Sequence, residues 1–389
     1  MDAYRTKVEI LHSRDENDRK RVRDFLEARG LESESDVEVT AFVSYDGRPA
    51  ATASLAGNVV KGVAVDPAME GEGLAAVAVS GIIGEARDRG IHLLRVFTSP
   101  KNETIFSALG FRRLAVSGGD AILLENDKRA FGRWAEAAKA DFARQVPADA
   151  AAASVAAAAP HASAVAAAAP HASAVAAAAA AAGEPRYKAG AVVVNCNPFT
   201  KGHRSLIERA AARCGRLLVF VLEADKSSFP ADVRLRLVRE GLADLKNVAV
   251  IKSGPYLISE ATFPTYFLKE KSRATEIHAR MDVTLFATLI APALGIEARF
   301  MGTEPYCVVT GLYNSLMKEI LPAHGIAAHE LPRVEAEGKA ISASTVREAL
   351  RTGDWPALEA LVPDTTINYL RSPEAAPVIE RIATGTTRH

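Results

Sequence analysis

Two short segments of this chain hold side chains that can bind and neutralise phosphate. The first, residues 195–203, reads NCNPFTKGH and ends in a histidine. The second, residues 341–350, reads ISASTVREAL and supplies several hydroxyl groups and one arginine. Imidazole, hydroxyl and guanidinium groups all donate hydrogen bonds to anionic oxygens, and a guanidinium can contact two oxygens at once. Both segments are therefore candidates for one polyphosphate site.

The elements around the first segment place it at the start of a helix. Residues 191–194 are small and apolar, which predicts a buried strand, and Asn197, Pro198 and Gly202 predict a tight turn after it. Apolar residues at helical spacing then predict a helix that begins near His203. The N-terminus of a helix offers free N–H groups and a partial positive charge, which stabilise a bound polyphosphate.

The second segment predicts another helix start. Ser342, Ser344 and Thr345 can cap this helix or donate hydroxyl hydrogen bonds, and Arg347 can hold phosphate oxygens with its forked guanidinium. Capping and phosphate binding are compatible for the two serines. His203 could likewise be no more than a capping residue of its own helix.

Together the segments resemble two signatures of the nucleotidyltransferase superfamily, (H/T)-x-G-H and I-S-x-(S/T)-x-x-R, here Thr200 to His203 and Ile341 to Arg347. A narrower resemblance, to the citrate (pro-3S)-lyase ligase family, covers residues 186–372. It rests on the stretches NCNPFTKGH, DKSSFPADVRLRLVREG, SGPYLISEATFPTYFL, MGTEPYCVVTGLYNSLM and ISASTVR. The resemblance implies an α/β fold with a C-terminal Rossmann-like nucleotidyltransferase domain, whose sheet is parallel, preceded by a smaller GNAT-like α+β domain.

The family resemblance also implies an activity. Its members are ATP-dependent acid-thiol ligases that acetylate the thiol of the prosthetic group on the acyl carrier subunit of citrate lyase. The reaction passes through acetyl-adenylate and releases AMP and diphosphate. ATP with Mg²⁺, acetate and the acyl carrier subunit are therefore the expected cofactors and partners. Such chemistry needs positioning and charge neutralisation rather than an enzyme nucleophile.

The same resemblance implies roles for individual residues. His203 is expected to donate to the α-phosphate, Thr200 to orient the same oxygens, and Arg347 to hold the leaving diphosphate. Further nucleotide contacts are expected from Asn197, Pro198, Phe199, Lys201, Gly202, Lys226, Ser342, Ser344 and Thr345. No side chain is expected to ligate a metal ion directly.

Several neighbouring residues keep alternative interpretations. Lys226 and Arg234 could bind the nucleotide or be charges on a surface lid. Glu304 and Tyr306 could contact adenine or ribose, or could merely close a turn. Cys196 lacks a neighbouring base in the sequence, so we expect a small packed thiol rather than a nucleophile.

The chain divides into four predicted segments. Residues 1–130 form the GNAT-like domain, and residues 131–185 a helical extension followed by an alanine-rich linker in which PHASAVAAAA is repeated. Such a linker has few large side chains to bury and cannot build a core. Residues 186–372 form the ligase domain, and residues 373–389 a C-terminal tail.

Two turns organise the predicted first domain. Asp46 and Gly47 predict a hairpin turn. Gly71 and Gly73 predict a glycine-containing turn after which a helix begins. By resemblance this glycine turn would hold the pyrophosphate of coenzyme A. Ala68, however, stands where the family pattern has Gln or Arg, which argues against acetyltransferase activity.

Composition is that of a globular enzyme. Of the 389 residues, Lys plus Arg and Asp plus Glu number 47 each, so no overall basic charge favours nucleic acid as a partner. The three cysteines lack disulfide or metal-site spacing. The N-terminal segment is too charged for a signal peptide, and the long apolar stretch is alanine with proline, so neither predicts a membrane association. A cytoplasmic location is expected.

Three other functions remain open on the sequence alone. The same ligase chemistry could serve the acyl carrier subunit of a malonate decarboxylase. A dinucleotide-forming adenylyltransferase would use the same two signatures. An acetyl-CoA-dependent acetyltransferase joined to an inactive second half is the third possibility.

Overall fold

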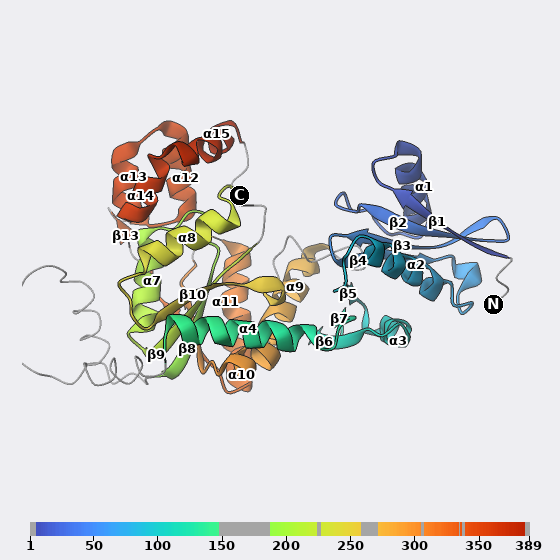
Figure 1. The fold of residues 1–389 in the computed structure, drawn as a ribbon, viewed down its shortest axis with the longest axis horizontal. Helices are drawn as coiled ribbons and strands as arrows, with labels where there is room; N and C mark the ends of the chain where they lie inside the picture. Colours follow the sequence, from blue (N-terminus) through green and yellow to red (C-terminus); the bar gives the residue numbers. More distant parts are fainter. Residues whose placement is uncertain are drawn as a thin grey trace, which may run out of the picture. The chain divides into compact units, whose positions relative to one another are not determined.

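The computed structural model describes residues 5–147, 187–223, 227–257, 271–304, 307–333, 335–336 and 339–385. The alanine-rich repeat, Lys226 and Tyr306 lie outside these residues. The chain forms two compact units: Met1–Gly132 with Thr262–Leu285, and Arg133–Ala261 with Phe286–His389. The first unit has a mainly antiparallel sheet and the second a parallel sheet, as expected from the sequence for an α+β domain followed by an α/β domain (Figure 1).

The first unit is built on a seven-stranded sheet of order β1-β2-β3-β4-β5-β7-β6. The strands are β1 Thr6–His12, β2 Val39–Tyr45, β3 Arg48–Ala56, β4 Val59–Val65, β5 Arg95–Thr98, β6 Arg112–Ser117 and β7 Ala121–Glu125. The pair β4–β5 is parallel, whereas the other neighbours are antiparallel. The helices are α1 Glu16–Glu27, α2 Leu74–Asp88, α3 Glu103–Ala108 and α9 Lys271–Leu285.

The two turns predicted in this unit are confirmed. Asp46 and Gly47 join β2 to β3 with φ values of 49° and 74°, the left-handed backbone that a two-residue hairpin turn requires. Gly71 and Gly73 also have positive φ, and α2 begins directly after Gly73. One face of α2 is buried with β2 and β3 in an apolar core. The hairpin β6–β7 completes the sheet on the far side of β5, with β7 paired to β5.

The second unit contains a five-stranded sheet of order β10-β9-β8-β11-β12, and every pair in it is parallel. Its strands are β8 Tyr187–Val194, β9 Cys214–Val221, β10 Val248–Lys252, β11 Ala298–Gly302 and β12 Ala327–Leu331. The apolar runs AVVVN, RLLVFVLE, NVAVIKSG, EARFMG and IAAHELPR predict these five strands, and all five are confirmed. From β8 the chain adds β9 and β10 on one side of this strand, and then crosses over to add β11 and β12 on its other side. In open parallel sheets ligands bind beyond the carboxyl ends of the strands at this reversal of strand order.

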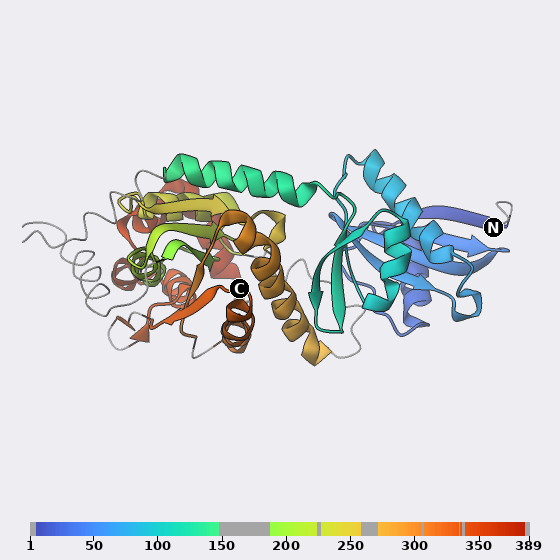
Figure 2. The same cartoon turned by 90° about the horizontal axis from the view of Figure 1, so that it is seen from below.

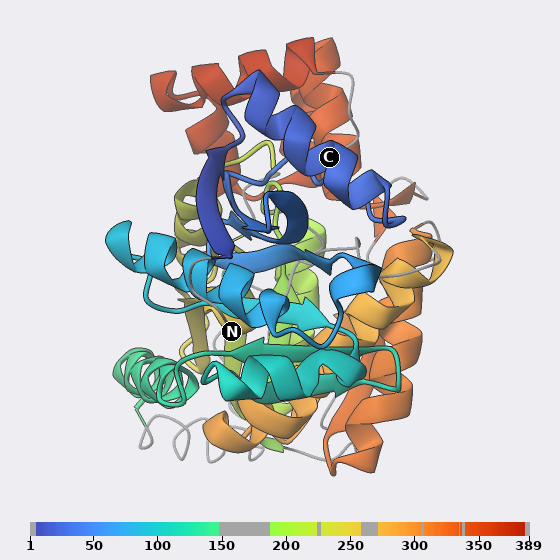
Figure 3. The same cartoon turned by 90° about the vertical axis from the view of Figure 1, so that its right-hand side faces the viewer.

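Helices complete the second unit. They are α4 Ala130–Gln145, α7 Lys201–Ala211, α8 Ala231–Gly241, α10 Ala291–Leu294, α11 Val308–Ala323, α12 Ala343–Thr352, α13 Trp355–Leu361, α14 Asp364–Leu370 and α15 Ala376–Thr384. The last four gather in one group, red in Figures 1 and 3. Val378 and Ile382 of α15 are buried in the same core as Val346 of α12. The sequence predicts a C-terminal tail at residues 373–389, but the described part of this segment, residues 373–385, includes a helix of the core.

Two further helices differ from the predicted division of the chain. α4, expected in an extension before the linker, lies along the sheet of the second unit (Figure 2), and the Gln145 amide bonds both backbone groups of Val250 on the edge strand β10. α9, expected in the ligase domain, packs on β6 of the first unit, where Ser117 donates to the Ile277 carbonyl at 2.9 Å. Contacts distant in sequence decide both assignments.

One helical run, Arg273–Leu294, is long and apolar enough to cross a membrane by length and composition alone. Its most apolar window is 67% buried within the protein. Burial of this extent is typical of the core helix of a globular fold.

Candidate functional site

The candidate site lies at the carboxyl ends of β8 and β11, where the strand order reverses. Residues 195–200 form the turn between β8 and α7, and residues 303–304 follow β11. The free N–H groups of α7 therefore open at the position where open parallel sheets bind ligands.

Thr200 and His203 cap α7 reciprocally. The backbone N–H of His203 donates to Thr200 Oγ1 at 3.2 Å, and the backbone N–H of Thr200 donates to His203 Nδ1 at 3.2 Å. Thr200 Oγ1 also lies 2.8 Å from Nδ1. Because Nδ1 accepts from a backbone N–H, the proton of the neutral ring belongs on Nε2. Capping thus prepares His203 as a hydrogen-bond donor through Nε2.

The surroundings of His203 keep its ring neutral. Burial, with a smaller effect of the nearby Arg333 guanidinium, lowers the pKa of His203 to about 4. Its ring stacks on Phe199, with centroids 6.2 Å apart and an interplanar angle of 17°. A neutral Nε2–H can strengthen its bond to an oxygen as negative charge develops there, without leaving a cation in the resting site.

The turn before α7 is rigidly held. The peptide bond between Asn197 and Pro198 is cis, and Cys196 has φ 52°. Asn197 Oδ1 accepts from the Phe229 N–H at 2.9 Å, and Phe199 is fully buried. Cys196 is buried as expected, and burial raises the pKa of its thiol. These residues shape the turn through its backbone and core contacts.

The interpretation of Arg234 as a charge on a surface lid is wrong. Arg234 is fully buried and donates to the carbonyls of Asn195 at 2.8 Å, Leu222 at 2.6 Å and Phe229 at 3.0 Å. A buried guanidinium bonded to three carbonyls fixes the loop backbone around it. Arg234 therefore stabilises the turn before α7 through its bond to the Asn195 carbonyl.

The two signature segments, distant in sequence, touch each other. A Cβ atom added at Gly202 would lie 2.9 Å from the carbonyl oxygen of Ile341, a separation that only glycine permits. Arg347, which is 8% exposed, donates from Nη1 to the carbonyl oxygen of Asn197 at 2.6 Å. The start of α7 and the start of α12 are thus held side by side.

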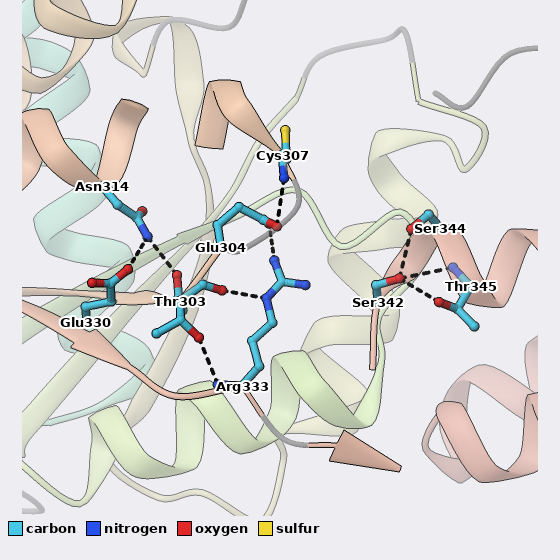
Figure 4. Close-up of polar contacts among 10 residues, drawn as sticks. Thr303, Glu304, Cys307, Asn314, Glu330, Arg333, Ser342, Ser344 and Thr345 are labelled. Carbon is cyan, nitrogen blue, oxygen red and sulfur yellow. Dashed lines mark hydrogen bonds and ion pairs between the residues drawn. The ribbon is translucent and has the colours of Figure 1, made fainter. Parts of the chain in front are cut away.

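The second segment presents a cluster of hydroxyl groups (Figure 4). Ser342 is the N-cap of α12, and its Oγ accepts from the Thr345 N–H at 3.1 Å. The hydroxyls of Ser344 and Thr345 each lie 2.8 Å from Ser342 Oγ. Hydroxyl rotors and helix N–H groups in one place can bind several oxygens of an anion.

The ammonium group of Lys201 contacts a backbone carbonyl instead of a hydroxyl of this cluster. It donates to the carbonyl oxygen of Glu359, in α13, at 2.7 Å. Lys226 lies outside the described residues. Several residues singled out from the sequence are brought into one region: Asn197, Phe199, Thr200, Gly202, His203, Arg347 and the Ser342 hydroxyl group.

Sequence reasoning missed Arg333, which follows β12. Its Nε donates to the Thr303 carbonyl at 2.6 Å, its backbone N–H donates to Thr303 Oγ1 at 3.1 Å, and its guanidinium is paired with Glu304 (Figure 4). No motif marked it, because its partners Thr303 and Glu304 follow a neighbouring strand, β11. Its place directly after a strand of the parallel sheet was the one available signal.

The donors present fit a polyphosphate better than a protein-bound metal ion. The described residues contain no group of three or more His, Cys, Asp or Glu side chains placed to hold a metal. Two capped helix N-termini, a neutral histidine donor and three hydroxyls form instead a cradle of hydrogen-bond donors. Such donors suit the oxygens of a nucleotide triphosphate.

Comparison with known proteins identifies relatives that match nearly the whole chain. The family model for the citrate lyase ligase C-terminal domain matches residues 189–370. The chain is 36% identical to a [citrate [pro-3S]-lyase] ligase from Klebsiella pneumoniae, over 94% of this chain and 95% of that protein. It is 34% identical to the enzyme of the same name from Escherichia coli (strain K12), over 90% and 89% of the two chains.

More distant similarities cover parts of the chain. A phosphopantetheine adenylyltransferase from Streptococcus pyogenes is 26% identical over 27% of this chain and 68% of its own. Among solved structures, Escherichia coli ElaA aligns with 31% of this chain and 99% of its own, at 11% identity and a TM-score of 0.28. The full-length similarity to two ligases is decisive: the chain belongs to the citrate lyase ligase family.

Proposed function

We propose that this protein uses ATP and acetate to acetylate the thiol of the prosthetic group on the acyl carrier subunit of citrate lyase. Its membership of the citrate lyase ligase family supports this function. The structural observation that carries it is the direct contact between the starts of α7 and α12 at the switch point of a parallel sheet. Two helix N-termini in contact give one site enough donors for a triphosphate.

The first step forms a phosphorus–oxygen bond. An acetate oxygen attacks the α-phosphorus of ATP, the bond to the β-phosphate oxygen breaks, and diphosphate leaves with the bonding electrons. His203 Nε2–H donates to an α-phosphate oxygen as its charge increases, and Thr200 holds the ring by its Nδ1 contacts. The α12 N-terminus with Ser342, Ser344 and Thr345 holds the leaving diphosphate. Mg²⁺ carried by the nucleotide would neutralise the β- and γ-phosphate oxygens.

The second step transfers the acetyl group to sulfur. The carrier thiolate attacks the acetyl carbonyl of the mixed anhydride, and AMP leaves as the anhydride bond breaks. No enzyme nucleophile enters this scheme, and the buried Cys196, whose thiol pKa is raised, is unsuited to that role. In this region the protein orients the reactants and neutralises their charge.

Arg347 needs a modified role. In the structure its Nη1 holds the Asn197 carbonyl, so this arm of the guanidinium joins the two signature segments. We assign it a positioning function for the α7 turn together with a contribution to the positive potential at the diphosphate. Lys201, bonded to Glu359, is assigned to the packing of α7 on α13.

The three alternative functions make different products. A ligase for a malonate decarboxylase would prefer that carrier as the thiol substrate. A dinucleotide-forming adenylyltransferase would transfer AMP from ATP to pantetheine phosphate or nicotinamide mononucleotide, and an acetyltransferase would consume acetyl-CoA. Similarity to an adenylyltransferase over 27% of the chain fits a shared nucleotide-binding fold, whereas the ligases match along nearly the whole chain.

A cytoplasmic location suits a reaction that consumes ATP.

One assay separates these possibilities. Purified protein is given ATP and Mg²⁺, with and without acetate, and diphosphate release is measured before and after addition of deacetylated citrate lyase carrier. We expect release that depends on acetate and turns over only when carrier is present, with one acetyl thioester formed per AMP. Acetate-independent release with pantetheine phosphate, or equal turnover with a malonate decarboxylase carrier, would contradict the proposal.

A further inference from the structure

We propose that Arg333 is a further ATP-binding residue, which directs one arm of its guanidinium from the end of β12 toward the phosphates. The inference rests on the proposed use of ATP at this site. It adds a residue that belongs to neither signature segment and that the sequence alone did not single out.

The first support is the way Arg333 is held. Thr303 accepts from its Nε at 2.6 Å and from its backbone N–H at 3.1 Å, while Glu304 pairs with Nη2. Glu304 Oε1 in turn accepts from the Cys307 N–H at 3.1 Å. Nη1 has no hydrogen-bond partner within the part of the chain that the structure describes. A guanidinium fixed at Nε and Nη2 presents its remaining arm in a defined direction.

The second support is its location. In Figure 4, Arg333 lies between Glu304 and the hydroxyl cluster of Ser342, with the arm that does not contact Glu304 on the side of that cluster. Arg333 is also near enough to His203 for its charge to contribute to the lowered pKa of that ring. One cation therefore acts electrostatically on the imidazole, and in Figure 4 its second arm is directed to the side of the hydroxyls that the proposed function assigns to phosphate.

The third support comes from the charge that the triphosphate requires. Lys201 and Arg347, the cations expected from the signature segments, donate to backbone carbonyls at 2.7 and 2.6 Å. His203 is neutral, and the helix N-termini supply only partial charges. Arg333 adds a further guanidinium charge, which Glu304 holds in place along one edge and partly offsets.

The strand ends that carry Arg333 are braced against each other. Asn314 Nδ2 donates to the Gly302 carbonyl and to Glu330 Oε1, both at 2.9 Å, and so ties the end of β11 to β12. Lys318 forms an ion pair with the same Glu330. Residues that follow both strands are thus prepositioned, which lowers the cost of ordering Arg333 when the nucleotide binds.

Calorimetric titration of the full-length protein with Mg²⁺ and ATP, in the absence of acetate, tests the role of Arg333. We expect Arg333→Gln to weaken ATP binding about 10- to 100-fold, since a charge-assisted hydrogen bond to phosphate is lost. Arg333→Lys should lose less, because it keeps the charge without the fork. Arg209→Gln is the matched control: Arg209 donates to the neighbouring Pro332 carbonyl at 2.6 Å from the third turn of α7, and its loss should leave ATP binding unchanged.

A second measurement excludes a merely structural role. In the nucleotide-free protein, Arg333→Gln should raise the pKa of His203 from about 4 toward 6.5 by removing the like charge, although burial keeps it below 6.5; ring resonances followed by NMR report this shift. Equal ATP affinity in wild type and folded Arg333→Gln, or an unchanged His203 titration, would overturn the proposal. The two proposals fail separately. Absence of acetate-dependent diphosphate release by the wild type would refute the ligase reaction. Weaker ATP binding by Arg333→Gln would still support the role of Arg333 in that case.

Discussion

At the scale of single residues, the site depends on a histidine that is neutral and oriented. Thr200 supplies the two contacts that direct Nδ1 inward, and burial beside Phe199 disfavours the charged ring. The chemistry of His203 therefore follows from its capping geometry. A histidine at an unconstrained helix start would be free to rotate and to titrate near pH 6.5.

Replacing His203 by alanine should reduce acetate-dependent diphosphate release by about 10²-fold or more, because one preorganised donor to the transition state is lost. Initial rates at saturating ATP measure the effect. His324→Ala is the control, since His324 contacts the Ile320 carbonyl at the far end of α11. A His203→Ala rate equal to that of His324→Ala would remove His203 from the mechanism.

The pH dependence has a defined sign. The pKa of His203 is lowered to about 4, so the ring is already neutral at pH 6.5 and gains a proton only as the pH falls toward 4. We expect an NMR titration of His203 with a midpoint well below 6.5, and no change in diphosphate release attributable to this residue between about pH 6 and 8. A midpoint at or above 6.5 would show that the imidazole is solvated and unsuited to its assigned role.

At the scale of elements, α7 and α12 matter through their first turns. Each begins with a side-chain cap, Thr200 on α7 and Ser342 on α12, and Gly202 lets the two starts approach to contact. Capping and phosphate binding use the same N-termini, since a side-chain cap satisfies one N–H group and leaves others for a ligand. Stability and function are therefore linked at these helix starts.

Ser342→Ala should lower the free energy of unfolding by about 1 kcal/mol, because the Thr345 N–H loses its acceptor. Ser344→Ala, which removes a hydroxyl from the same cluster without removing the cap, should cost less than half as much. Urea denaturation of the two variants compares them directly. Equal losses would show that Ser342 does not act as the N-cap.

At the scale of the whole molecule, the second unit draws on chain from both sides of the alanine-rich segment. α4 precedes that segment in sequence, yet Gln145 bonds both backbone groups of Val250, and Trp134 packs against Tyr256 with ring centroids 5.2 Å apart. The amide of Gln145 satisfies polar groups on an edge strand that would otherwise be available for pairing. α4 is thus a structural part of the unit that carries the site.

Gly254→Ala tests this docking of α4. A Cβ there would lie 2.2 Å from Trp134 Nε1, and Gly254 has φ 62°, so we expect destabilisation by about 2 kcal/mol or more. Gly295→Ala is the matched control, because Gly295 has φ 66° but no heavy atom within 4 Å of the added Cβ. The difference between their thermal or urea unfolding isolates the clash with α4. Equal destabilisation would mean that α4 is not packed at Gly254.

The sequence by itself determined the local features of this protein. Apolar runs identified all five strands of the parallel sheet, and Asp46-Gly47 identified the β2–β3 hairpin of the first unit. The two signature segments identified the helix starts. Each of these features depends on neighbours within a few residues. The same segments carried the family resemblance, which the full-length ligase relatives confirm.

Only the tertiary structure decided which side chains meet. The strand order β10-β9-β8-β11-β12 could not be read from any single segment. The same holds for three contacts between separate elements: Arg234 with Asn195, Arg347 with Asn197, and Arg333 with Thr303. A charged side chain looks the same in sequence whether it faces solvent, a backbone carbonyl or a ligand. Its role is set by which carbonyls and carboxylates the folded chain places within hydrogen-bond distance, and that depends on strand order and helix packing across the whole unit.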